Sequence, residues 1–247
     1  MEKKYKLTDE SVIVNGKTLH RIEALRDFGD VKKGNKGGFI EKENNLSQSG
    51  DCWVYGNARV YDNAVVYEDA RIYGNAVVYG NAQVYDYAKV YDNAQVCDDA
   101  SIYGNAWVFG NARVYCDARV YCDAMVCGNA DVYHNAVVCG NAKVCDNAEV
   151  CDNAEVYGYA QVSGNAEICG DAEIASNSDY ILFKNWWSSG RHFTWTKSNN
   201  MWKVGCFYGT GEELIEKAYK DSEKSGREYE KIVKYIESIL EDNNADV

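Results

Sequence analysis

Residues 54–83 read VYGNAR VYDNAV VYEDAR IYGNAV VYGNAQ, a repeat with a period of six residues. The repeat continues without insertion or deletion as far as Ile174. Every sixth residue from Val54 is Val or Ile, 21 times out of 21, and every residue four places later, from Ala58 to Ala172, is Ala, 20 times out of 20. Such regularity indicates one small structural unit stacked many times along an axis.

Each unit of the repeat contains a short strand and a turn. Ala and Val lie two residues apart and point to one side of an extended segment, while Tyr and the residue before Val point to the other side. The pair after Tyr is drawn mainly from Gly, Asp, Asn and Cys, as in Gly56-Asn57 and Asp62-Asn63. Gly and Asn tolerate the positive φ of tight turns. We therefore predict an all-β solenoid with Ala and Val inside.

The composition agrees with a solenoid and excludes several classes of protein. None of the 247 residues is proline, which inside a coil would delete a hydrogen bond of the ladder. The net charge of -12 argues against direct binding to nucleic acid or to an anionic membrane, because both require a positive field. The sequence contains neither a secretory signal nor an apolar run long enough for a membrane span, so we expect a cytoplasmic protein.

The repeat of Val or Ile and Ala resembles the hexapeptide-repeat proteins, in which an aliphatic residue and a small residue recur four places apart. The resemblance implies a left-handed triangular parallel β-helix with three hexapeptides per coil. Twenty hexapeptides then make about seven coils. The resemblance covers about half of the chain, and the left-handedness comes from it alone.

The segments on either side of the repeat are predicted to cap its open ends. In the first segment, Ser11–Val14 and Leu19–Ile22 are strand-like runs, and Asn15-Gly16 between them is a hairpin signal. We divide the chain into an N-terminal β-rich cap, the β-helix and a C-terminal α+β module: residues 1–45, 46–176 and 177–247.

The C-terminal module is predicted to hold three short strands, within 180–183, 193–196 and 201–204. Thr210, with Glu213 three residues later, is a capping-box signal, and the apolar periodicity that follows indicates one helix or two helices broken near Gly226. The run NWWSSGRHFTWT and the N-terminal run HRIEALRDFGDVKKGNKGGFIEKENNLSQSG resemble an uncharacterised group of hexapeptide-repeat proteins from gut bacteria and their bacteriophages. That resemblance implies a phage or prophage origin and a bacterial host cell.

Many proteins with this β-helix are acyltransferases, which use a catalytic His and inserted loops around an acyl-CoA pocket. The repeat here has no inserted loop, and its one histidine, His134, stands at a corner. We interpret His134 as a solvated corner residue rather than a catalytic base. His20 and His192 lie in the two caps, so a three-histidine zinc site is not expected. We predict no catalytic residue, metal or cofactor.

The ten cysteines are expected to be thiols, since a cytoplasmic compartment is reducing. Stacking at a spacing of 18 residues places Cys127 over Cys145 and Cys151 over Cys169. Neighbouring strands are about 4.8 Å apart, which allows a disulfide, although parallel side chains do not favour its torsion. We interpret these cysteines as replacements for Tyr rather than as redox centres or metal ligands.

The outward residues fall on three faces, and ladders of Tyr on all three are explained by stacking between neighbouring strands. One face adds apolar bulk of the kind that protein interfaces favour. It is our candidate surface for a protein partner or for self-association, and it comprises Trp53, Tyr55, Tyr73, Tyr91, Trp107, Phe109 and Met125.

Charge is graded along the repeat, with basic side chains in the first half and carboxylates in the second. The acidic end is a candidate decoy that would mimic a nucleic acid and occupy a basic cleft, as an anti-CRISPR-like antagonist of host defence would. It comprises Glu149, Glu155, Glu167, Glu173, Asp146, Asp152 and Asp171. The alternative is that these carboxylates only keep the stack soluble.

A third candidate surface lies in the C-terminal module and comprises Trp186, Trp187, Arg191 and Trp195. Packing on the last coil explains these residues at least as well. From these observations we predict a non-enzymatic protein-interaction scaffold. The acidic decoy is the first alternative, and a hexapeptide-repeat acyltransferase is the second.

Overall fold

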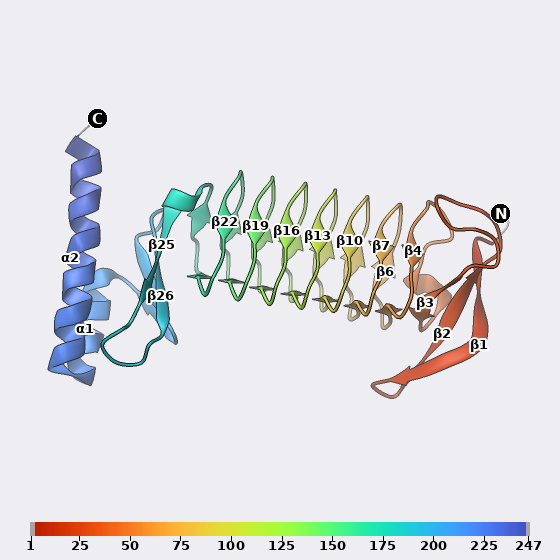
Figure 1. Cartoon of the computed structure of the whole chain (residues 1–247), viewed down its shortest axis with the longest axis horizontal. Helices are drawn as coiled ribbons and strands as arrows, with labels where there is room; N and C mark the ends of the chain where they lie inside the picture. Colours follow the sequence, from red (N-terminus) through yellow and green to blue (C-terminus); the bar gives the residue numbers. More distant parts are fainter. Residues whose placement is uncertain (1–2, 246–247) are drawn as a thin grey trace.

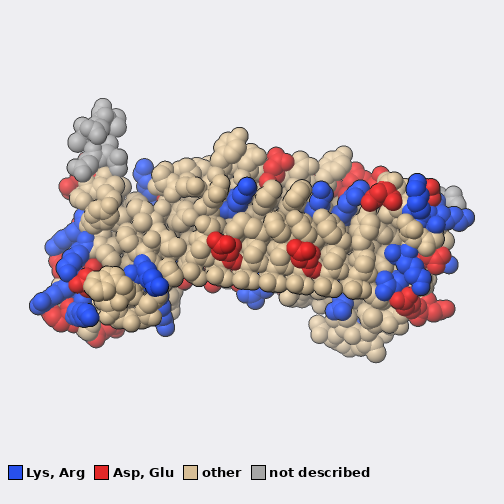
Figure 2. All heavy atoms as spheres, viewed as in Figure 1, with Lys and Arg blue, Asp and Glu red and all other residues tan. Residues whose placement is uncertain are grey.

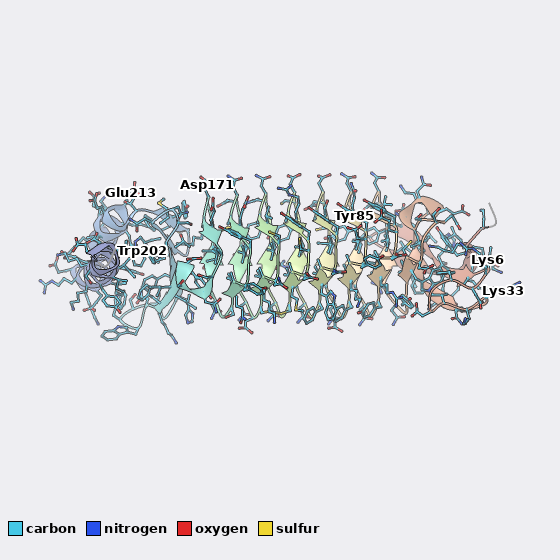
Figure 3. All side chains as sticks on the ribbon, turned by 90° about the horizontal axis from the view of Figure 1, so that it is seen from above. Lys6, Lys33, Tyr85, Asp171, Trp202 and Glu213 are labelled. Atoms are coloured by element: carbon cyan, nitrogen blue, oxygen red, sulfur yellow. A yellow bond between two sulfur atoms is a disulfide. The ribbon has the colours of Figure 1, made fainter. Side chains whose placement is uncertain are left out.

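The computed structural model describes residues 3–245 and has the form of a rod. A solenoid makes up the length of the rod, the β1–β2 hairpin lies at one end, and a small sheet with helices α1 and α2 lies at the other (Figure 1). The same side-chain positions recur from coil to coil between these ends, as far as Asp171 in the last coil (Figure 3). The predicted parallel β-solenoid is confirmed.

The solenoid consists of two-residue strands that pair in parallel with the strands 18 residues before and after them. Strands β4 to β24 make seven coils of three strands each, as expected, and belong to three sheets. Sheet 1 contains β4 (Trp53–Val54), β7 (Arg71–Ile72), β10 (Lys89–Val90), β13 (Trp107–Val108), β16 (Met125–Val126), β19 (Lys143–Val144) and β22 (Gln161–Val162).

The other two sheets of the solenoid are built in the same way. Sheet 2 contains β5 (Arg59–Val60), β8 (Val77–Val78), β11 (Gln95–Val96), β14 (Arg113–Val114), β17 (Asp131–Val132), β20 (Glu149–Val150) and β23 (Glu167–Ile168). Sheet 3 contains β6 (Val65–Val66), β9 (Gln83–Val84), β12 (Ser101–Ile102), β15 (Arg119–Val120), β18 (Val137–Val138), β21 (Glu155–Val156) and β24 (Glu173–Ile174).

The interior of the solenoid is the stack of small and branched residues that the repeat predicts. Each repeat Ala from Ala58 to Ala172 and each repeat Val or Ile from Val54 to Ile174 is 0% exposed. Backbone hydrogen bonds connect the coils, for example from Trp107 N to Ala124 O at 2.9 Å. A proline in such a donor position would remove the bond, which explains the absence of proline from the repeat.

The turns between the strands have one conformation throughout. The first turn residue has a positive φ in all twenty turns from Gly56 to Gly170, and in ten of them it is not glycine. Where it is Asp, its carboxylate accepts a hydrogen bond from the next coil, as Asp86 Oδ2 does from Gly104 N at 2.9 Å. Asn and Asp are the residues that tolerate this conformation best after Gly. Many carboxylates of the acidic repeat therefore have a structural role.

The N-terminal cap begins with the predicted hairpin, made of β1 (Tyr5–Val14) and β2 (Lys17–Ala24). Its turn residues Asn15 and Gly16 have φ of 50° and 78°, as the hairpin signal requires. Strand β3 (Lys36–Ile40) pairs with β2 and also in parallel with β5, so the cap extends sheet 2. A short 3-10 helix, η1 (Glu43–Asn45), leads into the first regular coil.

The C-terminal module is an antiparallel sheet followed by helices. After η2 (Asn177–Asp179), the sheet contains the three predicted strands and a fourth, β28, that the sequence analysis missed. The fourth strand is short and follows a tight turn at Gly205, which has a φ of 57°. The strands are β25 (Tyr180–Lys184), β26 (His192–Thr196), β27 (Met201–Val204) and β28 (Phe207–Gly209).

Helix α1 (Gly211–Asp221) begins with the predicted capping box, in which Thr210 and Glu213 satisfy each other's backbone N–H groups. Of the two predicted alternatives, the structure has two helices. The break lies at Ser222 rather than at Gly226, which lies inside α2 (Glu223–Ala245). Gly226 is needed there because a Cβ would collide with the ring of Tyr219 on α1. Within residues 3–245 neither helix is long and apolar enough to cross a membrane.

Candidate functional site

The face carrying sheet 1 is the candidate partner surface, and the structure divides it into two parts. In the first coil the surface is covered by the N-terminal cap. Trp53 is only 1% exposed, and its ring packs edge-on against Phe28 and Tyr5 with centroids 5.3 and 6.1 Å away. The hydroxyl of Tyr55 donates to Asp30 Oδ1 at 2.9 Å. The prediction that Trp53 contributes exposed apolar surface is therefore wrong.

Beyond the cap, the same face carries an open groove of about 700 Å³. The floor comes from outward residues of sheet 1, and one wall comes from the turns that precede its strands. Trp107 and Met125, both half-buried, line the groove as predicted. The full lining is Asp51, Asp69, Arg71, Tyr87, Lys89, Asn105, Trp107, Asp123 and Met125. Figure 2 shows that charged groups are scattered over the solenoid in this view and that most of the surface between them is uncharged.

Stacked aromatic rings lie beside the floor of the groove, on the same face of the solenoid. Tyr91 stacks between Tyr73 and Phe109, with ring centroids 4.9 and 4.8 Å apart. The ring of Trp107 lies edge-on to Tyr91, and Lys89 Nζ stands 4.6 Å from the centre of the indole. Four residues predicted for the partner surface thus form one aromatic layer: Tyr73, Tyr91, Trp107 and Phe109. Burial raises the pKa of the Tyr91 hydroxyl, with a further contribution from Tyr73, so the layer is neutral.

The wall of the groove is a row of side chains from the second residue of successive turns, which the sequence analysis did not single out. Other corners of the solenoid carry chains of Asn side chains, such as Asn93 Nδ2 donating to Asn111 Oδ1 at 3.1 Å. In the groove wall this chain is interrupted by Tyr87, which is 63% exposed. The signal was present in the sequence, because Tyr87 occupies a position that the repeat otherwise gives mainly to Asn or Asp.

The residues of the acidic patch do not share one face. Glu149 and Glu167 belong to sheet 2, while Glu155 and Glu173 belong to sheet 3 and are exposed. Glu167 lies under the C-terminal module, with Oε2 3.6 Å from Lys203 Nζ, and burial raises the pKa of its carboxyl above the usual value.

Three aspartates of the acidic patch are held by the turns themselves. Asp146 and Asp152 accept hydrogen bonds from the backbone N–H groups of Gly164 and Gly170, at 3.0 and 3.1 Å. Asp171 accepts from the side-chain amide of Asn153 at 2.9 Å. Each of these carboxylates therefore has a structural role in connecting neighbouring coils.

The C-terminal candidate surface is also divided. Trp187 and Trp195 are 7% and 2% exposed and belong to the core between the sheet and α2, so their prediction as surface residues is wrong. Trp187 packs edge-on against Tyr229 at 5.0 Å, and this contact between distant segments buries its ring. Trp186, 74% exposed, and Arg191 do lie on the surface.

The expectation that the cysteines are all thiols is wrong for two stacked pairs. Cys127 is bonded to Cys145, and Cys151 is bonded to Cys169, with Cα atoms 4.7 Å apart in both pairs. The parallel stacking brings the Cα atoms within the range of a disulfide, as the spacing of 18 residues predicts. Among the described residues the free cysteines are Cys52, Cys97, Cys116, Cys122, Cys139 and Cys206.

His134 stands at a corner of the solenoid, as predicted, with φ of 56° and about half of its side chain exposed. Its Nδ1 lies 3.0 Å from Asp152 Oδ1 in the following coil. Nδ1 is therefore the ring nitrogen that meets this carboxylate, and Nε2 faces away from it. His20 lies in β2 and His192 in β26, so the three histidines are not brought together.

Comparison with known proteins supports a repeat-containing β-solenoid. The model of the YdcK beta solenoid repeat matches residues 54–68 and 70–86, which include Arg71 of the groove. A protein of Escherichia coli (strain K12), described as "Uncharacterized acetyltransferase YdcK", is 49% identical over 37 residues. That match spans 15% of this chain and 11% of the E. coli protein, so the similarity covers only a small part of either protein.

Proposed function

We propose that this chain is a non-enzymatic protein-interaction scaffold whose binding surface is the groove on sheet 1. The observation that carries the proposal is the pairing of the half-buried Trp107 with Lys89 in an open groove of about 700 Å³. Aromatic residues in partly desolvated sites are the usual anchors of protein interfaces. The regular hydrogen-bonded coils beneath it hold the groove residues at fixed spacing.

The charges of the groove indicate what kind of partner fits. Arg71 and Lys89 stand on the floor, and Asp51, Asp69 and Asp123 stand in the wall. A protein segment with an apolar anchor, flanked by groups of both signs, would complement this pattern. The proposal includes a phage or prophage origin in a bacterial host, which rests on the resemblance of the two terminal runs. It also includes a cytoplasmic location, which rests on the composition of the sequence. A second copy of the chain is another candidate occupant.

The test is to introduce a charge at Trp107, the proposed aromatic anchor of the groove. Trp107→Glu should abolish capture of the partner from host lysate and should weaken any self-association seen by sedimentation. Trp186→Glu is the matched control, because Trp186 is an exposed indole outside the groove. Capture that survives Trp107→Glu but is lost in Trp186→Glu would place the surface in the C-terminal module and refute the groove.

The acidic decoy is an alternative, supported by the exposed Glu155 and Glu173, which are paired on neighbouring strands of sheet 3. It requires salt-sensitive binding to a basic protein. Changing Glu149, Glu155, Glu167 and Glu173 to Lys should then abolish that binding, while Trp107→Glu should leave it intact.

An acyltransferase is the second alternative, supported by the short similarity to the E. coli protein and by the contact of His134 with Asp152. A carboxylate on Nδ1 would leave Nε2 free to accept a proton from an acyl acceptor. Thiol release from acetyl-CoA that depends on His134, measured with His134→Gln as the comparison, would favour this alternative over the scaffold.

A further inference from the structure

The surroundings of the second disulfide contain a set of metal-ligating groups that the proposed scaffold does not use. The Sγ atoms of Cys151 and Cys169 and a carboxylate oxygen of Asp152 all lie within 4.8 Å of one another. Cys151 Sγ is 3.8 Å from Asp152 Oδ2. Both cysteines are 3% exposed, so the sulfur atoms are shielded from bulk water.

The position of Asp152 follows from the geometry of the turn. Asp152 is a first turn residue with φ of 59°, and its Oδ2 accepts from Gly170 N in the next coil at 3.1 Å. Gly170 directly follows Cys169, so this bond draws the carboxylate alongside both sulfur atoms. From the preceding coil His134 Nδ1 contacts Oδ1 at 3.0 Å. The carboxylate is thus held from both sides.

The first disulfide provides a contrast within the same molecule. Its Cα separation is also 4.7 Å, but Cys127 is followed by Gly128. The aspartate of this pair, Asp146, follows the second cysteine, and its Oδ2 accepts from Gly164 N one coil further on. Asp146 therefore leans away from Cys127, and the pair lacks a carboxylate placed between its two sulfur atoms.

We propose that, when the second disulfide is reduced, Cys151, Cys169 and Asp152 bind a zinc ion. Two molecules of a small thiol reduce the bond, giving two cysteine thiols and one disulfide of the small thiol. Zinc then displaces the two thiol protons to solvent, and water fills the fourth position. Tetrahedral zinc, with Zn–S of about 2.3 Å and Zn–O of about 2.0 Å, needs ligand atoms about 3.5 to 3.8 Å apart. The sulfur atoms have only to separate by a small distance on fixed strands.

His134 acts as a positioning residue in this site. Its contact with Oδ1 orients the carboxylate, as groups behind a metal ligand commonly do. The same two coils are thereby joined in either of two ways, by a disulfide in an oxidising compartment and by zinc in a thiol-rich one. The zinc state departs from the expectation that the chain binds no metal.

The test uses the full chain, reduced in the absence of air, freed of reductant and dialysed against zinc sulfate. We expect one zinc per chain by elemental mass spectrometry in the wild type and in the Cys127→Ser/Cys145→Ser control. Cys151→Ser/Cys169→Ser and the oxidised wild type should bind none. Cobalt should give a sulfur-to-metal charge-transfer band in the same two zinc-binding proteins.

Two further variants keep both sulfur atoms and the turn. Asp152→Asn retains an acceptor for Gly170 N, and it should weaken zinc binding because a neutral amide is a poor zinc ligand. His134→Gln should weaken it by about tenfold or more. The proposal is overturned if the reduced wild type binds no zinc, or if Cys151→Ser/Cys169→Ser binds as much as the wild type.

Discussion

The carboxylate of Asp86 should stabilise its turn in two separable ways. Asp86 has φ of 55°, and its Oδ2 accepts from Gly104 N at 2.9 Å in a partly buried position. Asn keeps the acceptor and tolerates positive φ, Gly tolerates positive φ but lacks the acceptor, and Ala lacks both. A set of three substitutions at this position therefore separates the hydrogen bond from the backbone conformation.

The magnitudes follow from these two effects. Loss of a partly buried hydrogen bond costs about 1 kcal/mol. A left-handed backbone costs a residue with an ordinary Cβ about 1 kcal/mol more. We expect Asp86→Asn to leave the free energy of unfolding nearly unchanged, Asp86→Gly to lower it by about 1 kcal/mol, and Asp86→Ala to lower it by about 2 kcal/mol.

The assay is urea unfolding followed by far-ultraviolet circular dichroism, with the midpoints compared at constant slope. Asp117→Ala is the control, because Asp117 is a second turn residue without a positive φ, and its loss should change the free energy of unfolding by less than about 0.5 kcal/mol. Equal stability of the Ala and Asn variants would refute the reasoning, and so would a Gly variant less stable than the Ala variant.

Two other predictions concern the C-terminal end of the rod. Burial raises the pKa of the Glu167 carboxyl, so its ionised form is disfavoured in the folded state. Glu167→Gln should therefore stabilise the protein at pH 7. This gain in stability should vanish as the pH falls below the ordinary glutamate pKa of about 4.3, where Glu167 is protonated in both the folded and the unfolded state. Thermal unfolding of both proteins across this pH range tests the sign. Gly226→Ala should destabilise the contact between α1 and α2 despite the better helix propensity of Ala, because its Cβ meets the Tyr219 ring. Stability should recover in part when Tyr219→Ala is added, and a stabilised single variant would contradict the collision.

The coil architecture is predictable from the sequence because one rule, Val and Ala two places apart every six residues, determines burial, register and stacking together. A shift of one residue would expose every core side chain, so few alternatives compete. The Asn15-Gly16 hairpin and the Thr210 cap are predictable for a similar reason, since each depends on residues close in sequence. Local rules of this kind do not need knowledge of the rest of the fold.

The candidate surfaces were less predictable because exposure depends on contacts between distant segments. Trp53 occupies an outward position of the repeat, yet Phe28 of the N-terminal cap covers it. Trp187 is buried by Tyr229 from α2, some forty residues later in the chain. In both cases the aromatic residue was noticed correctly and its partner was not. Trp107 escapes such cover because neither cap extends to β13, in the middle of the rod (Figure 1).

The carboxylates show how one composition can have two physical causes. A net charge of -12 suggests a field that acts on partners, but several of its contributors are first turn residues, where Asp tolerates positive φ and accepts a backbone N–H from the next coil. Asp92, for example, accepts from Gly110 N in the same way as Asp86 and Asp152 do from their next coils. Acidic residues on the strands, such as Glu155, and at the second position of a turn, such as Asp117, are free of this constraint. The case for an acidic decoy therefore rests mainly on the strand glutamates, while the aspartates at the first position of the turns would be retained in a solenoid with no partner at all.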